Sequence, residues 1–164
     1  MIKLLVFDVD GCMTHGDMTY SNDGNEYKSF NVKDGLAIAS WNKMGAKLAI
    51  ITGRESKIVE KRANELGISY FFQKVNKKID KLNEILKKEK LDYSNVAVIG
   101  DDLNDYEMLK CAGWSFSPND GSHFVKEVVD TILDTKGEDG AIREMIEKIL
   151  KRENRTEEFI KLWL

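Results

Sequence analysis

Residues 4–14 read Leu4-Leu5-Val6-Phe7-Asp8-Val9-Asp10-Gly11-Cys12-Met13-Thr14, an apolar run that ends in two aspartates and a glycine. A run of Leu, Val and Phe this short, ended by glycine, predicts a buried parallel strand rather than a helix. Open α/β sheets bind their ligands at the carboxyl ends of such strands. Asp8 and Asp10 would repel each other there unless a cation lay between them, and oxygen ligands in this number suit Mg²⁺. Taken alone, the pattern also fits a solvated Asp-rich turn.

Two later apolar runs end in a similar way. Residues 47–51 are followed by Thr52-Gly53-Arg54, and residues 96–99 are followed by Gly100-Asp101-Asp102-Leu103-Asn104-Asp105. Strands that alternate with helices predict βαβ units, and therefore a Rossmann-like parallel α/β sheet with helices on both faces. All three polar turns would then open on one edge of the sheet, where they would gather five carboxylates, one hydroxyl and at least one lysine. So many acceptors in one crevice would be strongly destabilising without a metal ion, whereas with Mg²⁺ and a phosphate they would form a phosphoryl-transfer site.

Smaller elements are expected between these strands. The turn Ser21-Asn22-Asp23-Gly24 predicts a β-hairpin inside a flap at about residues 14–31. Apolar periodicity and capping residues predict helices that start near residues 36, 56, 79, 141 and 156, the second running from Ser56 as its N-cap to Leu66 before Gly67. A further helix is expected after Asp105, ending at about Cys111. Short strands are expected at residues 68–72, 114–116 and 128–133.

Composition limits the partners and the cellular compartment. The 164 residues suffice for one domain, 1–164, with a C-terminal helix or tail at about 152–164. A formal charge of −3 gives no basic surface that would indicate nucleic acid or an anionic membrane. Cys12 and Cys111 form no disulfide framework, and no leader or membrane-length apolar run is visible. We therefore expect a cytoplasmic protein.

The order D-x-D-G-x-x-T, strand-end Thr, Lys and G-D-D-x-x-D resembles the haloacid dehalogenase-like phosphatase superfamily. The resemblance implies a magnesium-dependent phosphomonoester hydrolase in which Asp8 attacks phosphorus and becomes an aspartyl phosphate. It implies that Asp10 protonates the leaving group and then activates water, while its backbone carbonyl binds Mg²⁺. Asp8 and Asp101 would be the other metal ligands, and Asp102 and Asp105 would support them through direct or water-mediated contacts.

The same resemblance assigns the phosphate-binding residues. Thr52 and Gly53 would bind the phosphate, and a lysine would bridge it to the nucleophile. Lys77 and Lys78 are both candidates for that lysine, and Lys78 is preferred because it directly precedes the apolar pattern of the following helix. Neither interval between the motifs is long enough for a lid, so the chain is expected to be a capless member with an open crevice.

Within the superfamily, the sequence most resembles capless phosphatases that act on 3-deoxy-D-manno-octulosonate 8-phosphate. The shared residues are Gly24-x-Glu26-x-Lys28-x-Phe30, Asp34-Gly35, Thr52-Gly53-Arg54-x-Ser56 and Gly140-Ala141-Ile142-Arg143-Glu144. Arg54 has the planar fork suited to a sugar-acid carboxylate, or it is a surface ion-pair residue. Arg143 either binds an acidic substrate or pairs with Glu147. His15 and Glu138-Asp139 depart from the family pattern, so a nine-carbon sugar acid 9-phosphate is the alternative substrate.

Two other interpretations belong to different functional classes. A receiver-like domain that accepts a phosphoryl group also clusters aspartates, magnesium and a lysine, and a non-catalytic regulatory domain is the third possibility.

A further expectation concerns assembly, because an open crevice needs another segment or subunit to cover it. The resemblance implies a homotetramer in which the hairpin with Tyr20 and Tyr27, and the apolar C-terminal end, line a neighbour's site.

Overall fold

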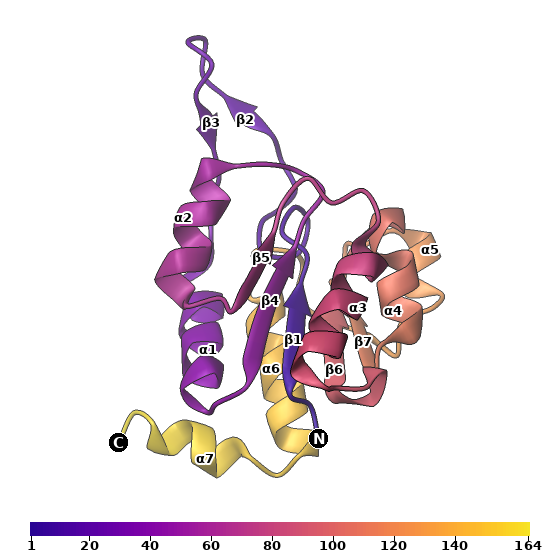
Figure 1. Ribbon diagram of the computed structural model, residues 1–164. Coiled ribbons are helices and arrows are strands. Elements are labelled where there is room, and N and C mark those ends of the chain that lie inside the picture. The colour runs from indigo at the N-terminus through magenta and orange to yellow at the C-terminus, as the bar shows by residue number, and fades with distance from the viewer.

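A parallel sheet of six strands organises the computed structural model, which describes residues 1–164 (Figure 1). Its strands lie in the order β5 (Tyr70–Phe72), β4 (Lys47–Ile51), β1 (Leu4–Phe7), β6 (Val96–Ile99), β7 (Trp114–Ser117) and β8 (Thr131–Ile132). Central strand β1 pairs with β4 and β6, and Phe7 is level with Ile50 and Ile99. The three strands that precede the polar turns therefore end side by side, as the α/β interpretation predicts.

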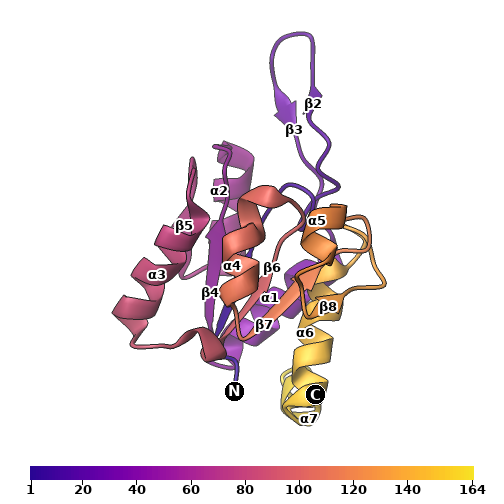
Figure 2. The same ribbon diagram turned by 90° about the vertical axis from the view of Figure 1, so that its right-hand side faces the viewer.

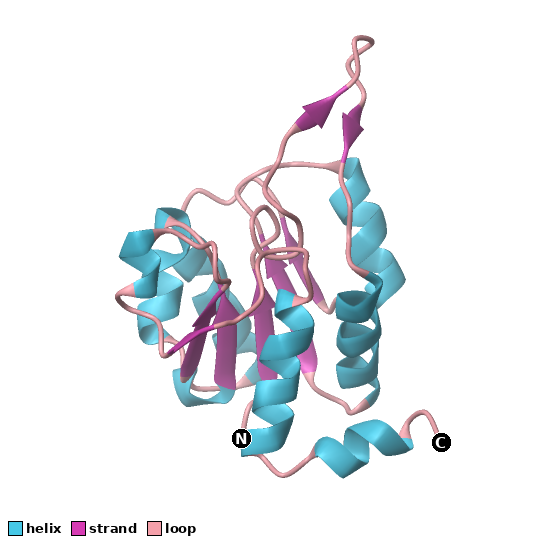
Figure 3. Cartoon of the chain, turned by 180° about the vertical axis from the view of Figure 1, so that it is seen from behind, coloured by secondary structure: helices cyan, strands magenta, loops and turns pink.

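Helices cover both faces of the sheet (Figures 1 and 3). One face carries α1 (Val32–Lys43), α2 (Lys57–Leu66) and α6 (Ala141–Arg152), and the other carries α3 (Lys78–Glu89), α4 (Tyr106–Cys111) and α5 (His123–Lys126). Side chains of β1 alternate between the two cores, with Leu5 and Phe7 in the first and Leu4 and Val6 in the second. Strand β1 is thus buried on both faces, which explains its unbroken apolar sequence.

Most of the predicted elements are confirmed, with differences at their ends. Helix α1 begins at Val32, earlier than expected, because the Asn31 side chain caps it by accepting a hydrogen bond from the backbone N–H of Lys33 at 2.8 Å. Helix α2 has the predicted bounds, but Ser56 makes no side-chain cap. The strand expected at residues 128–133 shortens to β8, and the short helix α5 was not predicted. Two 3₁₀ turns, Tyr93–Asn95 and Leu103–Asp105, precede β6 and α4.

The predicted hairpin is present and projects away from the sheet (Figure 2). It consists of β2 (Thr19–Tyr20) and β3 (Glu26–Tyr27), which pair only with each other in antiparallel fashion. Apart from this hairpin, no insertion separates β1 from α1, and only α2 and β5 lie between β4 and α3. The fold therefore has no cap domain.

The last helix, α7 (Thr156–Lys161), lies at the end of the sheet opposite the hairpin (Figure 1). Phe159 is buried in the first core, and the Trp163 indole N–H donates to Ser40 Oγ at 3.1 Å. Within one chain the tail therefore packs on its own domain and does not cover the strand ends. Ile160 and Trp163 remain about half exposed, at 49% and 52%. None of the helices combines the length and apolar character that a membrane crossing requires.

Candidate active site

The three polar turns meet in a cavity of about 310 Å³ at the carboxyl ends of β1, β4 and β6. This is the edge where open α/β sheets bind ligands. Its lining consists of Asp8, Asp10, Thr52, Gly53, Arg54, Asp101, Asp102, Leu103 and Asn104. Residues that are separated by more than 90 positions in the sequence thus surround one small volume, because parallel strand pairing brings their turns together.

A buried lysine lies behind this cavity. Lys78 is the first residue of α3, and its Nζ donates to Asp8 Oδ1 at 2.5 Å and to Asp105 Oδ1 at 2.6 Å. Its side chain has no exposed surface. The Lys77 side chain is 65% exposed, and its ion-pair partner is Asp80, whose Oδ1 lies 3.9 Å from Nζ. Of the two candidate lysines, only Lys78 therefore contacts the predicted nucleophile.

Asp105 links this lysine to the third turn. Its other oxygen, Oδ2, accepts hydrogen bonds from the backbone N–H groups of Asp101 and Asp102, at 3.2 and 3.5 Å. Asp105 is fully buried and does not line the cavity. Its contacts are therefore those of a support for Lys78 and for the turn that carries Asp101, whereas Asp102 is exposed and caps the 3₁₀ turn at Leu103 N.

The buried carboxylates oppose one another electrostatically. Burial, and then the negative charge of Asp105, raise the pKa of Asp8 well above its usual value, although Lys78 acts in the other direction. The same two causes raise the pKa of Asp101 to about 7. For Lys78, burial acts to lower the pKa, but Asp8 and Asp105 outweigh it and the pKa rises. The site therefore has fewer cations in contact than its carboxylates need.

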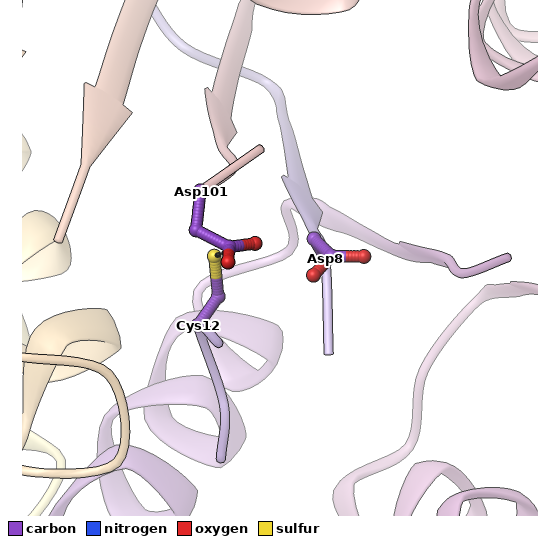
Figure 4. A group of neighbouring side chains, drawn as sticks. All are labelled: Asp8, Cys12 and Asp101. Carbon is purple, nitrogen blue, oxygen red and sulfur yellow. Dashed lines mark hydrogen bonds between the residues drawn. The ribbon is translucent and has the colours of Figure 1, made fainter. Parts of the chain in front are cut away.

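The donor set fits a hard divalent cation. Ligand atoms of Asp8, Cys12 and Asp101 lie within 4.8 Å of one another (Figure 4). Burial and Asp101 raise the pKa of the Cys12 thiol, so it stays protonated and the two carboxylates remain as the anionic ligands. Gly11 allows this approach: its φ is +101°, and a Cβ there would lie 2.1 Å from Asp101 Oδ2.

Thr52 and Gly53 also line the cavity. Thr52 is buried, its backbone N–H donates to Phe72 O at 3.0 Å, and its carbonyl accepts from Val75 N at 3.1 Å. These bonds fix the end of β4 between β5 and the segment that leads to α3. The predicted phosphate-binding residues are therefore held rigidly at the rim of the cavity.

The two arginines proposed for substrate binding lie in different places. Arg54 lines the cavity, where its Nη2 donates to the Tyr20 hydroxyl at 3.1 Å and lies 3.9 Å from Glu26 Oε1. Arg143 does not line this cavity but a separate surface hollow beside α6, and its Nε donates to Glu147 at 2.5 Å. Of the two alternatives for Arg143, the pairing with Glu147 is the one seen within a single chain.

The two departures from the family pattern contact each other. The His15 backbone N–H donates to Glu138 Oε2 at 3.2 Å, and the His15 ring lies 3.3 Å from Asp139 Oδ1. Gly137, which precedes Glu138, packs closely against the backbone of Gly11, because a Cβ at Gly137 would lie 2.1 Å from Gly11 O. A basic residue in one loop thus matches acidic residues in the other, and together they hold the loop after Asp10 in place.

Sequence reasoning missed one contact of the site. Lys28, which follows the hairpin, donates from Nζ to Asp10 Oδ1. It was noted only as part of the shared pattern. No spacing rule relates a residue after a hairpin to a strand-end aspartate, so nothing in the sequence alone indicates this contact.

Comparison with known proteins gives consistent matches. A family model described as haloacid dehalogenase-like hydrolase matches residues 70–146. The chain is 35% identical to the 3-deoxy-D-manno-octulosonate 8-phosphate phosphatase KdsC of Haemophilus influenzae, over 96% of this chain and 88% of the relative. The enzyme of the same name from Escherichia coli K12 is 34% identical, over 96% and 84%.

Solved structures agree with this match. The phosphatase of that name from Moraxella catarrhalis, in complex with magnesium, phosphate and KDO, has a TM-score of 0.95 and 40% identity, covering 99% of this chain and 92% of that one. A cobalt-bound deoxy-D-mannose-octulosonate 8-phosphate phosphatase from Haemophilus influenzae has a TM-score of 0.88 and 36% identity, covering 93% and 90%. Both are far above the similarity that a shared fold alone requires.

We predict that Lys78→Met destabilises the protein by about 3 kcal/mol, because it leaves Asp8 and Asp105 buried without their cation. The measurement is urea unfolding with a chelator present, so that no metal ion replaces the missing charge. Lys77→Met is the matched control and should change the unfolding free energy by less than about 0.5 kcal/mol. Equal effects of the two substitutions would contradict the assignment of Lys78.

Proposed function

Because this chain belongs to the haloacid dehalogenase-like hydrolase family and is a phosphatase, we propose that it hydrolyses 3-deoxy-D-manno-octulosonate 8-phosphate through Asp8 with the help of Mg²⁺. The observation that carries the proposal is the Lys78 ammonium, which holds the buried Asp8 carboxylate at 2.5 Å beside Asp101. The regulatory alternatives left open by the sequence receive no support from relatives that carry the names of phosphatases.

The chemistry requires two steps at Asp8. First, a carboxylate oxygen of Asp8 forms a bond to phosphorus while the bond from phosphorus to the sugar oxygen breaks, and Asp10 gives that oxygen a proton. Second, Asp10 takes a proton from water as the water oxygen attacks phosphorus. The aspartyl phosphate then releases inorganic phosphate and restores the Asp8 carboxylate. Lys78 supports both steps by holding Asp8 in place.

The residues that would hold Mg²⁺ are the carboxylates of Asp8 and Asp101 and the backbone carbonyl of Asp10. The pKa of Asp101, raised to about 7 by burial and then by the negative charge of Asp105, supports this assignment, because it indicates a carboxylate without enough positive charge around it. When bound, the ion would neutralise negative charge between the phosphate and the two carboxylates. Asp102 and Asp105 would act from outside this set, Asp105 through Lys78 and the backbone of the turn.

The residues at the rim of the cavity support an acidic sugar phosphate as the substrate. Thr52 and Gly53 would bind the phosphate, while Arg54, which is 48% exposed at the rim, would pair with the carboxylate of the sugar acid. A nine-carbon sugar acid 9-phosphate offers the same carboxylate and remains the alternative. The names of the relatives favour the eight-carbon substrate.

We predict that Asp8→Asn abolishes phosphate release, because an amide is not a nucleophile for phosphorus. Asp80→Asn, a matched change on the exposed face of α3, should retain full activity. In Asp10→Asn supplied with p-nitrophenyl phosphate, whose leaving group needs little protonation, phosphopeptide mass spectrometry after acid quench should find a phosphoryl group on Asp8, because this variant lacks the base for the second step. Activity of Asp8→Asn above about one hundredth of the wild-type rate would refute the nucleophile.

A second prediction tests the substrate. Arg54→Ala should raise KM for 3-deoxy-D-manno-octulosonate 8-phosphate much more than for a small neutral phosphate ester, because only the sugar acid has a carboxylate to pair. A screen of eight-carbon and nine-carbon sugar acid phosphates on the wild-type enzyme ranks the two candidates. Equal losses on the acidic and the neutral substrate would give Arg54 a structural or phosphate-binding role instead.

We further propose that the chain forms a homotetramer in which each hairpin walls a neighbour's site. Tyr20 and Tyr27 on the hairpin are 58% and 55% exposed, and two strands of two residues each are too short to be stable alone. Light scattering should therefore give a mass near four times 18.7 kDa. A mass near that of the monomer, together with full activity, would refute the shared wall.

A further inference from the structure

Lys28 is a buried cation that the mechanism above does not use. Its side chain is only 1% exposed, although it follows the exposed hairpin strand β3. Its Nζ donates to Asp10 Oδ1 and has two further neighbours, Glu26 Oε1 at 3.6 Å and Met18 Sδ at 3.9 Å. A buried ammonium is costly unless it is paired and hydrogen-bonded. The hairpin base thus brings a charged group to the second aspartate of the site.

Only one of these neighbours accepts a strong hydrogen bond. Glu26 Oε1 is too distant from Lys28 and from Arg54, at 3.6 and 3.9 Å, and it has no hydrogen-bond partner. Asp10 is therefore the group to which Lys28 is anchored. Because Asp10 also lines the cavity, the contact runs from the hairpin directly to the side chain that must transfer a proton.

We propose that Lys28 is a positioning residue that orients Asp10 by occupying its Oδ1, so that Oδ2 is the oxygen that gives and receives the proton. The inference rests on the proposed function, in which Asp10 is the general acid and base. An ammonium has three donors and no acceptor, so it binds the carbonyl oxygen of a protonated carboxyl and leaves the hydroxyl on the other oxygen.

In both steps the proton is then transferred at the same atom, Asp10 Oδ2. In the first step the Oδ2 proton moves to the leaving oxygen as its bond to phosphorus breaks. In the second step Oδ2 takes a proton from the attacking water, and Lys28 acts only as a hydrogen-bond donor to Oδ1. Because Lys28 belongs to the segment after β3, this arrangement holds only while the hairpin base is in place.

The test uses phenyl phosphate and p-nitrophenyl phosphate, which are similar in size and carry no carboxylate. Phenolate is the poorer leaving group and depends more on protonation by Asp10 than the nitro-substituted phenolate does. In Lys28→Met, kcat/KM for phenyl phosphate should fall by about tenfold more than kcat/KM for p-nitrophenyl phosphate. Lys28→Met combined with Asp10→Asn should be no slower than Asp10→Asn alone, because Lys28 acts through Asp10.

Controls separate this role from others. Lys87→Met, the same change at an exposed position of α3, should match the wild type on both esters. If Lys28→Met does not fold, as judged by thermal unfolding, Lys28→Gln should show the same difference between the esters. Equal losses on the two esters would mean a structural role, and a loss confined to the sugar-acid phosphate would mean substrate binding. Either result, or no loss at all, would overturn the proposal.

Different variants test the nucleophile Asp8 and the positioning residue Lys28. Persisting activity in Asp8→Asn would refute the proposed function itself. An inactive Asp8→Asn, together with a Lys28→Met variant that treats both esters alike, would leave the function standing and remove only the positioning role of Lys28.

Discussion

The Lys78 ammonium between Asp8 and Asp105 is the interaction on which the rest of the site depends. Three aspartates from two strand ends lie close together in a buried volume, and Lys78 is the one lysine that hydrogen-bonds to two of them. Its position follows from α3, whose first residue is Lys78 and contacts Asp8 at the end of β1. Asp105 also accepts hydrogen bonds from the backbone N–H groups of Asp101 and Asp102, so it connects Lys78 to the turn that carries Asp101. The same residues therefore balance the buried charge and fix the backbone of the site.

Much of this arrangement was predictable from the sequence because it is local or periodic. An apolar run ended by Asp8, Asp10 and Gly11 specifies both a buried strand and a polar strand end. Parallel topology then brings the turns at Thr52 and Asp101 to the same edge, which the strand order and register confirm. The distinction between Lys77 and Lys78 also followed from local pattern, since only Lys78 begins the helix.

Contacts between distant surface segments were not predictable. Lys28 reaches Asp10 because the chain returns from the hairpin past the cavity, and this path is not encoded in any spacing. The pairing of His15 with Glu138 and Asp139 looked like two separate departures until the structure brought the loops together. The pair of Arg143 and Glu147 differs from these contacts, because it joins residues four apart on α6 and was one of the two alternatives that the sequence offered.

The hairpin contributes almost nothing to either hydrophobic core, because its strands pair only with each other and its two tyrosines are more than half exposed. Substitutions at its tip therefore cost little folding free energy. Over evolutionary time such a segment can accumulate changes that the sheet cannot tolerate. Its contacts with the site are the bond of Lys28 to Asp10 at its base and the bond of Arg54 to Tyr20. A lineage of such enzymes could thus acquire new substrates by drift in a segment of about ten residues while its catalytic machinery stays constant.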